Sequence, residues 1–425
     1  MPYFLDLFAG AGGLSEGFIQ AGYTPVAHVE MDEAACYTLK TRAAYHWLSN
    51  DGQIDVYNRY LRAETGRNEF YQHIPENVLS AVLHYEISDD TLPDIFQQID
   101  RLLNGERLDL IIGGPPCQAY SIAGRSRSEN GMIGDHRNYL YRLYAEFLTR
   151  YQPSYFVFEN VTGLLSARDE DGTLHFNNMI SLFAECGYKT EYEVLNARDY
   201  GVLQNRRRII LIGALNEEEE RGYPDIPSIQ NDGINVNELF ADLPFLNAGE
   251  GTPLPVPTLP YHGRYLYESG IKQYDLEPVT FHVARPHMQQ DLEIYELAVN
   301  VWNTEHRRIN YSELPKHLQT HKNKDTFLDR FKVVAGDVPY SQTVVAHISR
   351  DGHYYIHPDI HQNRSLTPRE AARLQTFPDN YYFESKKGPP SRTLAYKQIG
   401  NAVPVRLAYC VANALLPYFD DPEHQ

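Results

Sequence analysis

The sequence has few cysteines, and their spacing argues against two common uses of this residue. The four cysteines, Cys36, Cys117, Cys186 and Cys410, lie far apart, and no two form a C-x-x-C pair. Zinc clusters and disulfide frameworks both require cysteines at closer or repeated spacings. The sequence therefore predicts neither, and a reducing compartment such as the cytoplasm is expected.

The chain also lacks the segments that direct proteins into or across membranes. Met1 leads within three residues into an apolar strand, and no basic region precedes that strand. We find no apolar run of about 18 residues, the length that a membrane-spanning helix needs. Secretion and membrane insertion are therefore disfavoured. Internal repeats and low-complexity segments are missing too, so 425 residues predict two domains, or one with a large insertion.

Basic charge is scarce overall, but it is unevenly distributed. The chain has 38 Lys and Arg against 56 Asp and Glu, which gives a formal net charge of −18. This balance alone argues against a nucleic-acid partner. Residues 217–220 are all glutamate, however, and residues 305–332 carry Arg, Lys and His side chains close together. A basic face on an acidic protein is compatible with this pattern, so composition does not decide the partner.

Over the first 215 residues, short apolar runs alternate with amphipathic stretches. This alternation is typical of βαβ units and a parallel sheet. The predicted strands are 3–8, 24–30, 108–112, 155–159 and 208–212. Helices are predicted over 14–21, from the end of the second strand to about 47, and over 139–151.

The pattern changes near residue 216. Residues 222–262 are rich in proline, glycine and asparagine, and we predict that 263–360 is irregular with some strand. Regularity returns at Thr367, where Pro368 takes the first position of a helix, and a last helix is predicted over 402–418.

Cys117 follows the apolar strand 108–112 through a rigid turn, Gly113-Gly-Pro-Pro-Cys117. The prolines fix the backbone just before the thiol, and the glycines permit a ligand or another backbone to approach closely. A thiolate at the end of a central strand can attack a bound ligand if its surroundings are polar. We therefore interpret Cys117 as a nucleophile rather than a structural cysteine.

A glycine-rich turn follows the first strand and opens the first helix. Its glycines are spaced Gly10-x-Gly12-Gly13, and Glu30 ends the second strand about twenty residues further on. An acidic residue at that place holds ribose hydroxyls in doubly wound folds. A nicotinamide cofactor would require G-x-G-x-x-G, so the spacing favours a nucleoside without a pyrophosphate, such as S-adenosylmethionine.

Two further segments place polar residues at strand ends. Glu159 closes an apolar strand beside Asn160 and could stay protonated or share a proton there. Gln204, Arg206 and Arg208 alternate along the start of another strand, so they share one face. Arginines that lead directly into a core strand bind an anionic group or orient a carboxylate.

With these segments the chain resembles the DNA cytosine-5 methyltransferase family. Seven motifs follow the family's order: Phe8-Ala-Gly-x-Gly-Gly13, Gly114-Pro-Pro-Cys-Gln118, Asp135-x-Arg137-Asn138-x-Leu140, Phe158-Glu-Asn-Val161, Gln204-x-Arg206-x-Arg208, residues 366–378 and Gln398-Ile-Gly-Asn-Ala-Val-Pro404. The resemblance implies a Rossmann-like doubly wound α/β domain that binds S-adenosylmethionine, formed by 1–215 and 389–425. It places a smaller, mostly irregular or β target-recognition domain, with a connecting motif, at 216–388. Within this part, we expect 216–360 to choose the DNA sequence.

The resemblance also implies a role for each matched residue. Cys117 would attack C6 of a flipped cytosine, Glu159 would bind N3, and Arg206 and Arg208 would hold the base and orient Glu159. S-adenosylmethionine would give its methyl group to C5 and leave as S-adenosylhomocysteine, without a metal. The expected cofactor contacts are Phe8, Ala11, Gly13, Glu30, Met31, Glu86, Ile87, Pro116, Leu140, Asn401 and Val403. The expected DNA and loop contacts are Gln118, Ser121, Arg125 and Gln204.

The resemblance has one notable departure and leaves alternatives open. The family's acidic adenine contact is usually Asp-Ile, and here Glu86-Ile87 takes its place after a long insertion over 48–84. An RNA cytosine methyltransferase of the same fold is one alternative, although the Cys-Phe-Thr signature of the tRNA-directed branch is absent. An inactive DNA-binding regulator is another, disfavoured because Cys117, Glu159 and Arg208 are all retained.

The resemblance also implies a cellular setting. Double-stranded DNA is the expected partner, with a cognate restriction endonuclease acting independently and no membrane. The expected location is the bacterial cytoplasm, in association with the nucleoid.

Overall fold

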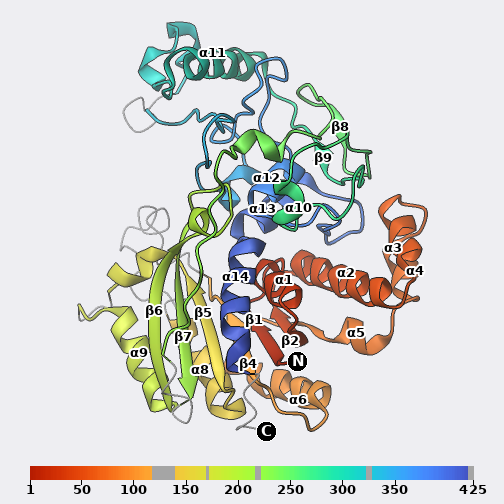
Figure 1. Ribbon diagram of the computed structural model, residues 1–425, viewed down its shortest axis with the longest axis vertical. Coiled ribbons are helices and arrows are strands. Elements are labelled where there is room, and N and C mark those ends of the chain that lie inside the picture. The colour runs from red at the N-terminus through yellow and green to blue at the C-terminus, as the bar shows by residue number, and fades with distance from the viewer. Residues whose placement is uncertain (117–138, 169–171, 216–221, 322–327, 420–425) are drawn as a thin grey trace.

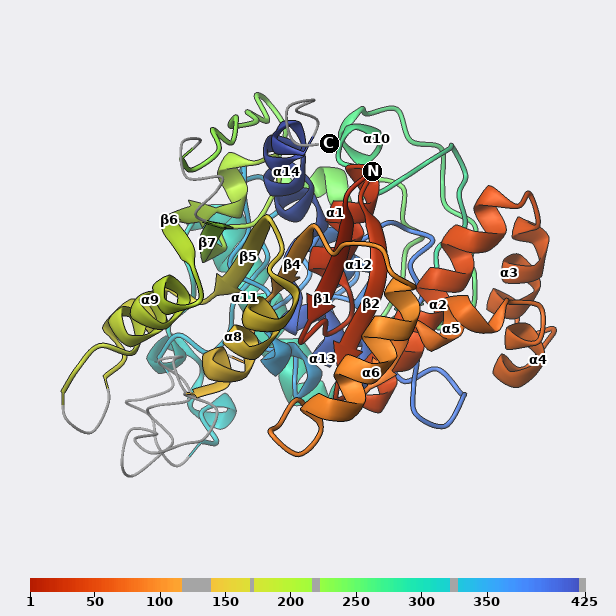
Figure 2. The same cartoon turned by 90° about the horizontal axis from the view of Figure 1, so that it is seen from below.

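A seven-stranded sheet with helices on both faces forms one half of a computed structural model of the chain (Figures 1 and 2). The structure describes residues 1–116, 139–168, 172–215, 222–321 and 328–419. The strands of the sheet are β1 (Tyr3–Leu7), β2 (Thr24–Glu30), β3 (Val82–His84), β4 (Leu110–Gly113), β5 (Tyr155–Asn160), β6 (Tyr188–Asn196) and β7 (Arg207–Leu215). Their order across the sheet is β3-β2-β1-β4-β5-β7-β6. The doubly wound α/β fold predicted from the sequence is confirmed.

One strand runs against the predicted direction. β1 to β5 are parallel to one another, but β7 is antiparallel to both β5 and β6. The sheet is therefore mostly parallel rather than wholly parallel. β7 can reverse because β6 and β7 are consecutive strands, joined by a short connection instead of a crossover helix.

Helices cover both faces of this sheet. The helices of this half are α1 (Gly13–Gln20), α2 (Glu33–Asn50), α6 (Leu92–Leu103), α8 (Leu140–Tyr151), α9 (His175–Glu185), α13 (Arg392–Asn401) and α14 (Val405–Leu415). α6, α8 and α9 share one apolar cluster with Leu5 and Ile111, whereas α1 and α14 share another with Phe4 and Ile112. Because successive strand residues point to opposite faces, a strand covered on both sides is apolar throughout, as β4 is.

Residues 48–84 were predicted to be an insertion. Between the end of α2 and the start of β3, this stretch folds as three short helices. These are α3 (Ile54–Leu61), α4 (Arg67–Tyr71) and α5 (Glu76–Ser80), and they lie at the edge of the sheet next to β3 (Figure 1). Tyr60 stacks on Phe70 with ring centroids 4.4 Å apart, and its hydroxyl donates to Glu384. The insertion is therefore packed against the chain that follows α12.

The other half has little regular structure, as predicted, but it contains a helix that was not. Its elements are β8 (Gly251–Thr252), α10 (Tyr265–Glu268), β9 (His282–Val283), α11 (Gln289–Glu305) and α12 (Pro368–Leu374). The prediction that 263–360 holds only irregular chain and some strand is wrong for α11, which buries Ile294, Tyr295 and Ala298 on one face. This helical spacing is visible in the sequence.

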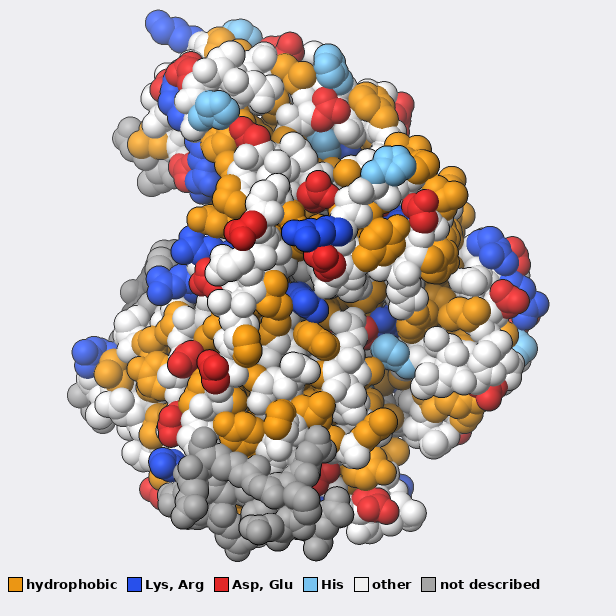
Figure 3. Space-filling view, viewed as in Figure 1, with side chains coloured by type: hydrophobic (Ala, Val, Ile, Leu, Met, Phe, Trp, Pro, Cys, Tyr) orange, Lys and Arg blue, Asp and Glu red, His pale blue; other side chains and the backbone are white. Residues whose placement is uncertain are grey.

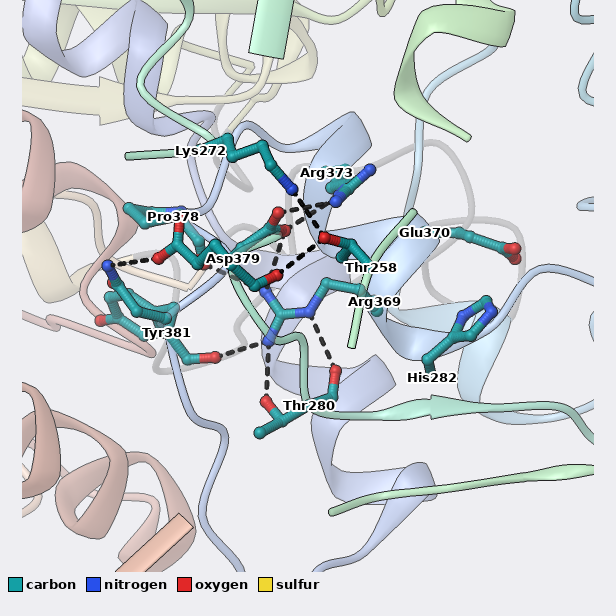
Figure 4. A network of polar contacts seen from close by, with 12 residues as sticks. Thr258, Lys272, Thr280, His282, Arg369, Glu370, Arg373, Pro378, Asp379 and Tyr381 are labelled. Atoms are coloured by element: carbon teal, nitrogen blue, oxygen red, sulfur yellow. Dashed lines mark hydrogen bonds and ion pairs between the residues drawn. The ribbon is translucent and has the colours of Figure 1, made fainter. Parts of the chain in front are cut away.

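α12 begins where the sequence predicts, and its buried charges tie this half together. Thr367 caps the helix and Pro368 follows it, as predicted, and Glu370 closes a capping box. Arg373 is fully buried between Asp242 and Asp379, at 2.5 and 2.6 Å (Figure 4). Burial opposes charge here, but the Arg373 guanidinium outweighs it and holds the pKa of Asp242 below its usual value.

One stretch of the described chain is long and apolar enough to cross a membrane by length and composition, Arg392–Tyr418. The sequence was predicted to contain no such stretch. The structure divides it into α13 and α14, and α14 packs against α1 inside the molecule. Gly17 of α1 permits this contact, because a Cβ there would lie 2.5 Å from Cβ of Ala408. Two interior helices account for the apolar composition.

Replacing Arg373 with Leu should lower the free energy of unfolding by about 3–5 kcal/mol, because two buried carboxylates lose their partner. Arg150→Leu is the matched control, since Arg150 pairs with Asp100 in an exposed position and should cost less than about 1 kcal/mol. Urea unfolding of the two variants measures the difference. Equal losses would contradict the importance given to the buried network.

Candidate active site

The site forms where β1, β4 and β5 end together. Leu7 pairs with Gly113, and Gly113 pairs with Phe158, so the last residues of β1 and β4 lie in register with Phe158, two residues before the end of β5. The next residues in each strand direction, Phe8, Gly114 and Glu159, therefore emerge at one edge of the sheet. This edge, the carboxyl edge of parallel strands, is where ligands bind in open α/β folds.

Arg208 reaches the same edge because β7 runs antiparallel to β5. Asn160 pairs with Ile209, which places the start of β7 beside the end of β5. Arg208 Nε lies 2.6 Å from Glu159 Oε1, and both side chains are largely buried. The predicted partnership of Glu159 and Arg208 is thus present, and it fixes one carboxylate oxygen by a charge-assisted hydrogen bond.

Gly114 leaves room for the second oxygen of this carboxylate. A Cβ at Gly114 would lie 2.7 Å from Glu159 Oε2 and 2.8 Å from the Glu159 carbonyl oxygen. Asn160 holds the same turn, because its side-chain amide donates to the Pro115 carbonyl at 3.2 Å. The turn that leads to Cys117 is therefore attached to the strand that carries Glu159. Cys117 itself lies outside the described residues, as do Gln118, Ser121 and Arg125.

A small cavity at this edge gathers predicted residues from four parts of the chain. Its walls are Asp6, Phe8, Ala9, Gly10, Ala11, Gly13, Leu14, Gly114, Glu159, Asn401, Ala402 and Val403. Five of the predicted cofactor contacts are among them: Phe8, Ala11, Gly13, Asn401 and Val403. Since Glu159 lines the same cavity, the structure places the expected cofactor region directly beside the Glu159–Arg208 pair.

The turn after β1 has the unusual backbone that a close-approach site requires. Phe8 has φ of +58°, which is a strained conformation for a residue other than glycine. Gly12, with φ of +77°, precedes α1, and a Cβ there would lie 2.8 Å from Leu39 and 2.9 Å from Tyr381. Only glycine fits that position, so the glycine spacing seen in the sequence has a steric cause.

Asp6 was not singled out in the sequence, although it stands two residues before Phe8 at the floor of the cavity. It is 1% exposed, and among the described residues its Oδ2 has no hydrogen-bond partner. Burial and the nearby Glu30 carboxylate raise the pKa of Asp6 well above its usual value. An acidic residue within an otherwise apolar strand was the available signal.

The remaining predicted cofactor residues lie around this cavity rather than in its wall. Glu30 ends β2 and accepts the Gly10 and Asp32 backbone N–H groups, each at 2.7 Å, and burial raises its pKa. Met31 is 55% exposed just beyond it. Glu86 is exposed and Ile87 is buried, two and three residues after β3, whose His84 pairs with Glu30. Pro116 and Leu140, both half-buried, flank the undescribed segment.

Arg206 and Gln204 occupy a different place from the one expected. Arg206 was predicted to orient Glu159, but its guanidinium is buried and donates to the carbonyls of Val344 and Ala402, at 2.5 and 2.7 Å. Gln204 was predicted to contact DNA, but it is fully buried and donates to Leu374 O at 2.7 Å. The predicted alternation is present, because Gln204 and Arg206 are buried and Asn205 and Arg207 are exposed. Gln204 and Arg206, however, lie in the interior, whereas Arg208 on the same face lies at the site.

A larger cleft of about 590 Å³ lies between the two halves, beside the start of β7. Its walls are Asn205, Trp302, Arg308, Val333, Ala335, Val338, Pro339, Tyr340, Ser341, Gln342 and Thr343. Figure 3 shows a notch between the part that carries α11 and the part that carries the sheet, with Lys and Arg side chains on both of its walls. This boundary could admit a large anionic ligand.

The basic stretch 305–332 offers less free charge than its sequence suggests. Arg307 pairs with Glu305 and Glu313, and Arg308 and Lys332 both lie near Asp329. Lys322 and Lys324 lie outside the described residues. Exposed ion pairs are weak, so these arginines could exchange a carboxylate for a phosphate at small cost.

Sequence comparison assigns this architecture to a family. The sequence model of the C-5 cytosine-specific DNA methylase family matches residues 3–58 and 79–416. The unmatched residues between these ranges fall within α3, α4 and the start of α5, the predicted insertion. The chain belongs to the C-5 cytosine-specific DNA methylase family and transfers a methyl group from S-adenosylmethionine to cytosine in DNA.

Individual relatives agree with this assignment. The chain is 40% identical to the type II methyltransferase M.Bpa9945I of Bacillus paralicheniformis over 97% of its own length and 98% of the relative's. It is 29% identical to the type II methyltransferase M.DdeI of Desulfomicrobium norvegicum, over 98% of this chain and 89% of the relative. A solved E. coli prophage chain described as a DNA modification methyltransferase shares the fold, with TM-score 0.63, 20% identity and coverage of 99% and 100%. The family assignment supports DNA rather than RNA as the substrate and an active methyltransferase rather than a regulator.

Gly114→Ala should slow methylation on the order of 100-fold, because the new methyl group displaces the Glu159 carboxylate from its position. Gly66→Ala is the control, since a Cβ there meets nothing within 4 Å and the backbone has φ of −80°. Single-turnover methylation of DNA, with melting temperatures for both variants, measures the effect. Undiminished turnover by a folded Gly114→Ala protein would contradict the proposed placement of the carboxylate.

Proposed function

We propose that Cys117 and Glu159 carry out the methyl transfer through a covalent intermediate on the cytosine. The observation that supports this most is the Arg208–Glu159 ion pair, 2.6 Å long, at the end of the strand to which the Cys117 turn is attached. A positioned carboxyl group can bind or protonate N3, while a thiolate attacks C6. Arg208 keeps the carboxyl group oriented toward the base.

The reaction would proceed by attack at C6, methyl transfer to C5 and loss of the C5 proton. The Cys117 thiolate forms a bond to C6. The electron pair of the C5–C6 double bond shifts to the C4–C5 bond, and the C4–N3 pair shifts to N3, which gains a hydrogen bond or a proton from Glu159. C5 becomes nucleophilic and takes a methyl group, for which S-adenosylmethionine supplies the electrophilic carbon. An acceptor such as water then takes the C5 proton, the electrons of that C–H bond restore the C5–C6 double bond, and the C6–S bond breaks to release the Cys117 thiolate, while N3 returns any proton to Glu159. No redox partner is required.

The target cytosine has to leave the DNA stack to reach this site, because its C5 and C6 atoms are enclosed in a duplex. The cavity beside Glu159 lies at the carboxyl edge of the sheet, whereas the 590 Å³ cleft follows the start of β7. We propose that double-stranded DNA lies along the cleft, with the flipped base directed toward Glu159. Gln118, Ser121 and Arg125 would then close over the DNA.

The residues around the small cavity fit S-adenosylmethionine. The cofactor carries an ammonium group, and Asp6 offers a buried carboxylate oxygen without a partner among the described residues. Glu30 would hold the ribose hydroxyls, and the exposed Met31 would cover the adenine, with Glu86, Ile87, Pro116 and Leu140 nearby. Phe8, Ala11, Gly13, Asn401 and Val403 would form the wall that keeps water away.

We also propose that residues 216–388 form the target-recognition domain and connecting motif, with 1–215 and 389–425 as the catalytic domain. The last part of the connecting motif is tied to the catalytic half, since Tyr381 donates to Ala11 O at 2.6 Å. Specificity would then come from 216–360. Base readout depends on which side chains of this segment reach the groove.

The chain would act as the modification component of a restriction–modification system, with an endonuclease that works independently. This proposal is supported by its type II relatives. The DNA on which bacterial relatives act lies in the cytoplasm, so a cytoplasmic location follows, and association with the nucleoid is proposed.

Exchanging residues 216–360 for the corresponding segment of a relative with another specificity should move the methylated site. The measurement is bisulfite sequencing of DNA from cells that express the chimera, with the unaltered chain as the control. The unaltered chain should methylate one cytosine in one short sequence. Methylation of the original site by an active chimera would refute the proposed role of this segment.

Asp6 should make cofactor affinity depend on pH. In the cofactor-free protein the pKa of Asp6 is raised, so the carboxyl group is protonated until the pH exceeds that value. A bound ammonium group favours the ionised form, so binding releases a proton. Affinity for S-adenosylhomocysteine should rise with pH from the ordinary range of aspartate up to the raised pKa, and stay constant above it.

Calorimetry in buffers of different ionisation enthalpy measures this proton release. Asp6→Asn should remove most of it, leaving the contribution of Glu30, whose pKa is also raised by burial. Asp109→Asn is the control, because Asp109 also has a raised pKa but lies before β4, at the opposite edge of the sheet. Equal proton release by wild type and Asp6→Asn would rule out this contact.

A further inference from the structure

The cofactor cavity and the cleft are joined by a single buried layer of hydrogen bonds. Residues 401–403 line the cofactor cavity, and residues 341–343 line the cleft. Val344 and the buried side chains of Gln204 and Arg206 lie between these walls. A displacement of one wall therefore acts on these buried groups.

Arg206 contacts the cofactor wall directly, and it contacts the cleft wall through Val344, the residue that follows this wall in the chain. Its guanidinium donates to Val344 O on the cleft side at 2.5 Å, and to Ala402 O on the cofactor side at 2.7 Å. A third contact reaches Gly400 O at 3.4 Å. With 1% exposure, the guanidinium has no access to solvent that could replace these carbonyls. Moving either wall alone would break a charge-assisted hydrogen bond in a buried place.

Two glutamines extend the same connection. Gln375 donates to Ile399 O and Ala402 O, at 2.9 and 3.1 Å, and accepts a hydrogen bond from Gln204 at 3.0 Å. Gln204 in turn accepts from the Val344 N–H at 2.8 Å. The backbone of Val344 is thus held on both its N–H and its carbonyl side. The cofactor wall and the cleft wall share one set of donors and acceptors.

Close packing also makes a displacement of one wall act on the other. A Cβ at Gly400 would lie 2.3 Å from the backbone nitrogen of Ala346, so α13 touches the chain that follows Val344 directly. Next to it, Asn205 donates its N–H to Ser341 O, and the Ser341 N–H donates to Leu203 O, both at 2.9 Å. The cleft wall is therefore attached to the start of β7 by backbone hydrogen bonds.

We propose that Arg206 is a positioning residue that couples cofactor binding to DNA binding, by holding the 401–403 wall and the 341–343 wall in one arrangement. The inference rests on the proposed placement of both ligands. A ligand that orders one wall also orders the other through Arg206, so the second ligand binds to a wall whose ordering cost is already met. The coupling is reciprocal, so each ligand raises the affinity for the other by the same factor.

The test measures Kd for S-adenosylhomocysteine by calorimetry, with and without a duplex that contains the methylated site, on the full chain. For the wild type, DNA should lower this Kd about fivefold or more. In Arg206→Lys the factor should fall toward one, because a lysine ammonium cannot span both carbonyls as the planar guanidinium does. Kd for S-adenosylhomocysteine alone should change far less than the factor does.

Arg369→Lys is the matched control. Arg369 is also fully buried and donates to three carbonyls, those of Thr280, Pro378 and Tyr381 (Figure 4). None of these three residues lines either cavity, and although Tyr381 also donates to Ala11 of the cofactor wall, no hydrogen bond of Arg369 leads to the cleft wall. The control should therefore lower the melting temperature as Arg206→Lys does, but keep the wild-type coupling factor. If Arg206→Lys fails to fold, Gln375→Met is read in the same way, since it keeps Arg206 but removes the bonds to Ile399 and Ala402.

The outcomes separate this inference from the proposed function. If both ligands bind the wild type but do so independently, the coupling is refuted and the proposed sites stand. Wild-type coupling that survives in Arg206→Lys, or disappears equally in Arg369→Lys, would also refute the role of Arg206. Failure of S-adenosylhomocysteine or DNA to bind the wild type would overturn the proposed sites and the coupling together.

Discussion

The antiparallel direction of β7 is the constraint on which the site depends. A parallel β7 would begin at the opposite edge of the sheet and leave Glu159 without Arg208. The same reversal brings the start of the strand, 204–206, between the cofactor wall and the cleft wall. One change of strand direction therefore places the Glu159–Arg208 ion pair, the junction between the two halves and the cleft at a single edge.

Buried charge holds the less regular half together. A region with few strands and helices has few backbone ladders to fix its shape, and α12 replaces them with guanidinium groups. Arg364 binds Glu370, and Arg373 binds two aspartates from separate segments, Asp242 and Asp379. Burying these groups is costly by itself, so such pairs specify one arrangement more than they add stability. A segment with one fixed shape is what the proposed recognition of a DNA sequence requires.

The sequence allowed five strands of the sheet, the start of α12 and part of the lining of the small cavity to be predicted, because these follow from local rules. Apolar runs mark strands, Thr367-Pro368 marks a helix start, and glycine spacing marks the turn after β1. The direction of β7 depends on its pairing with β6, which no local pattern reports. The burial of Arg206 and Gln204 depends on Val344, about 140 residues further along the chain. The place of Asp6 in the cavity depends on residues 401–403 and 159, which lie far from it in the sequence, so no local pattern could predict it.

The central claim is that Cys117 attacks the cytosine while Glu159 holds it. The most direct test incubates the enzyme and S-adenosylmethionine with duplex DNA that carries 5-fluorocytosine at the methylated position. Fluorine at C5 cannot leave as a proton does, so the last step is blocked and the adduct should accumulate. We predict a denaturant-stable complex whose peptide map places methylated 5-fluorocytosine on Cys117. Full binding without an adduct, or an adduct on another residue, would contradict the account.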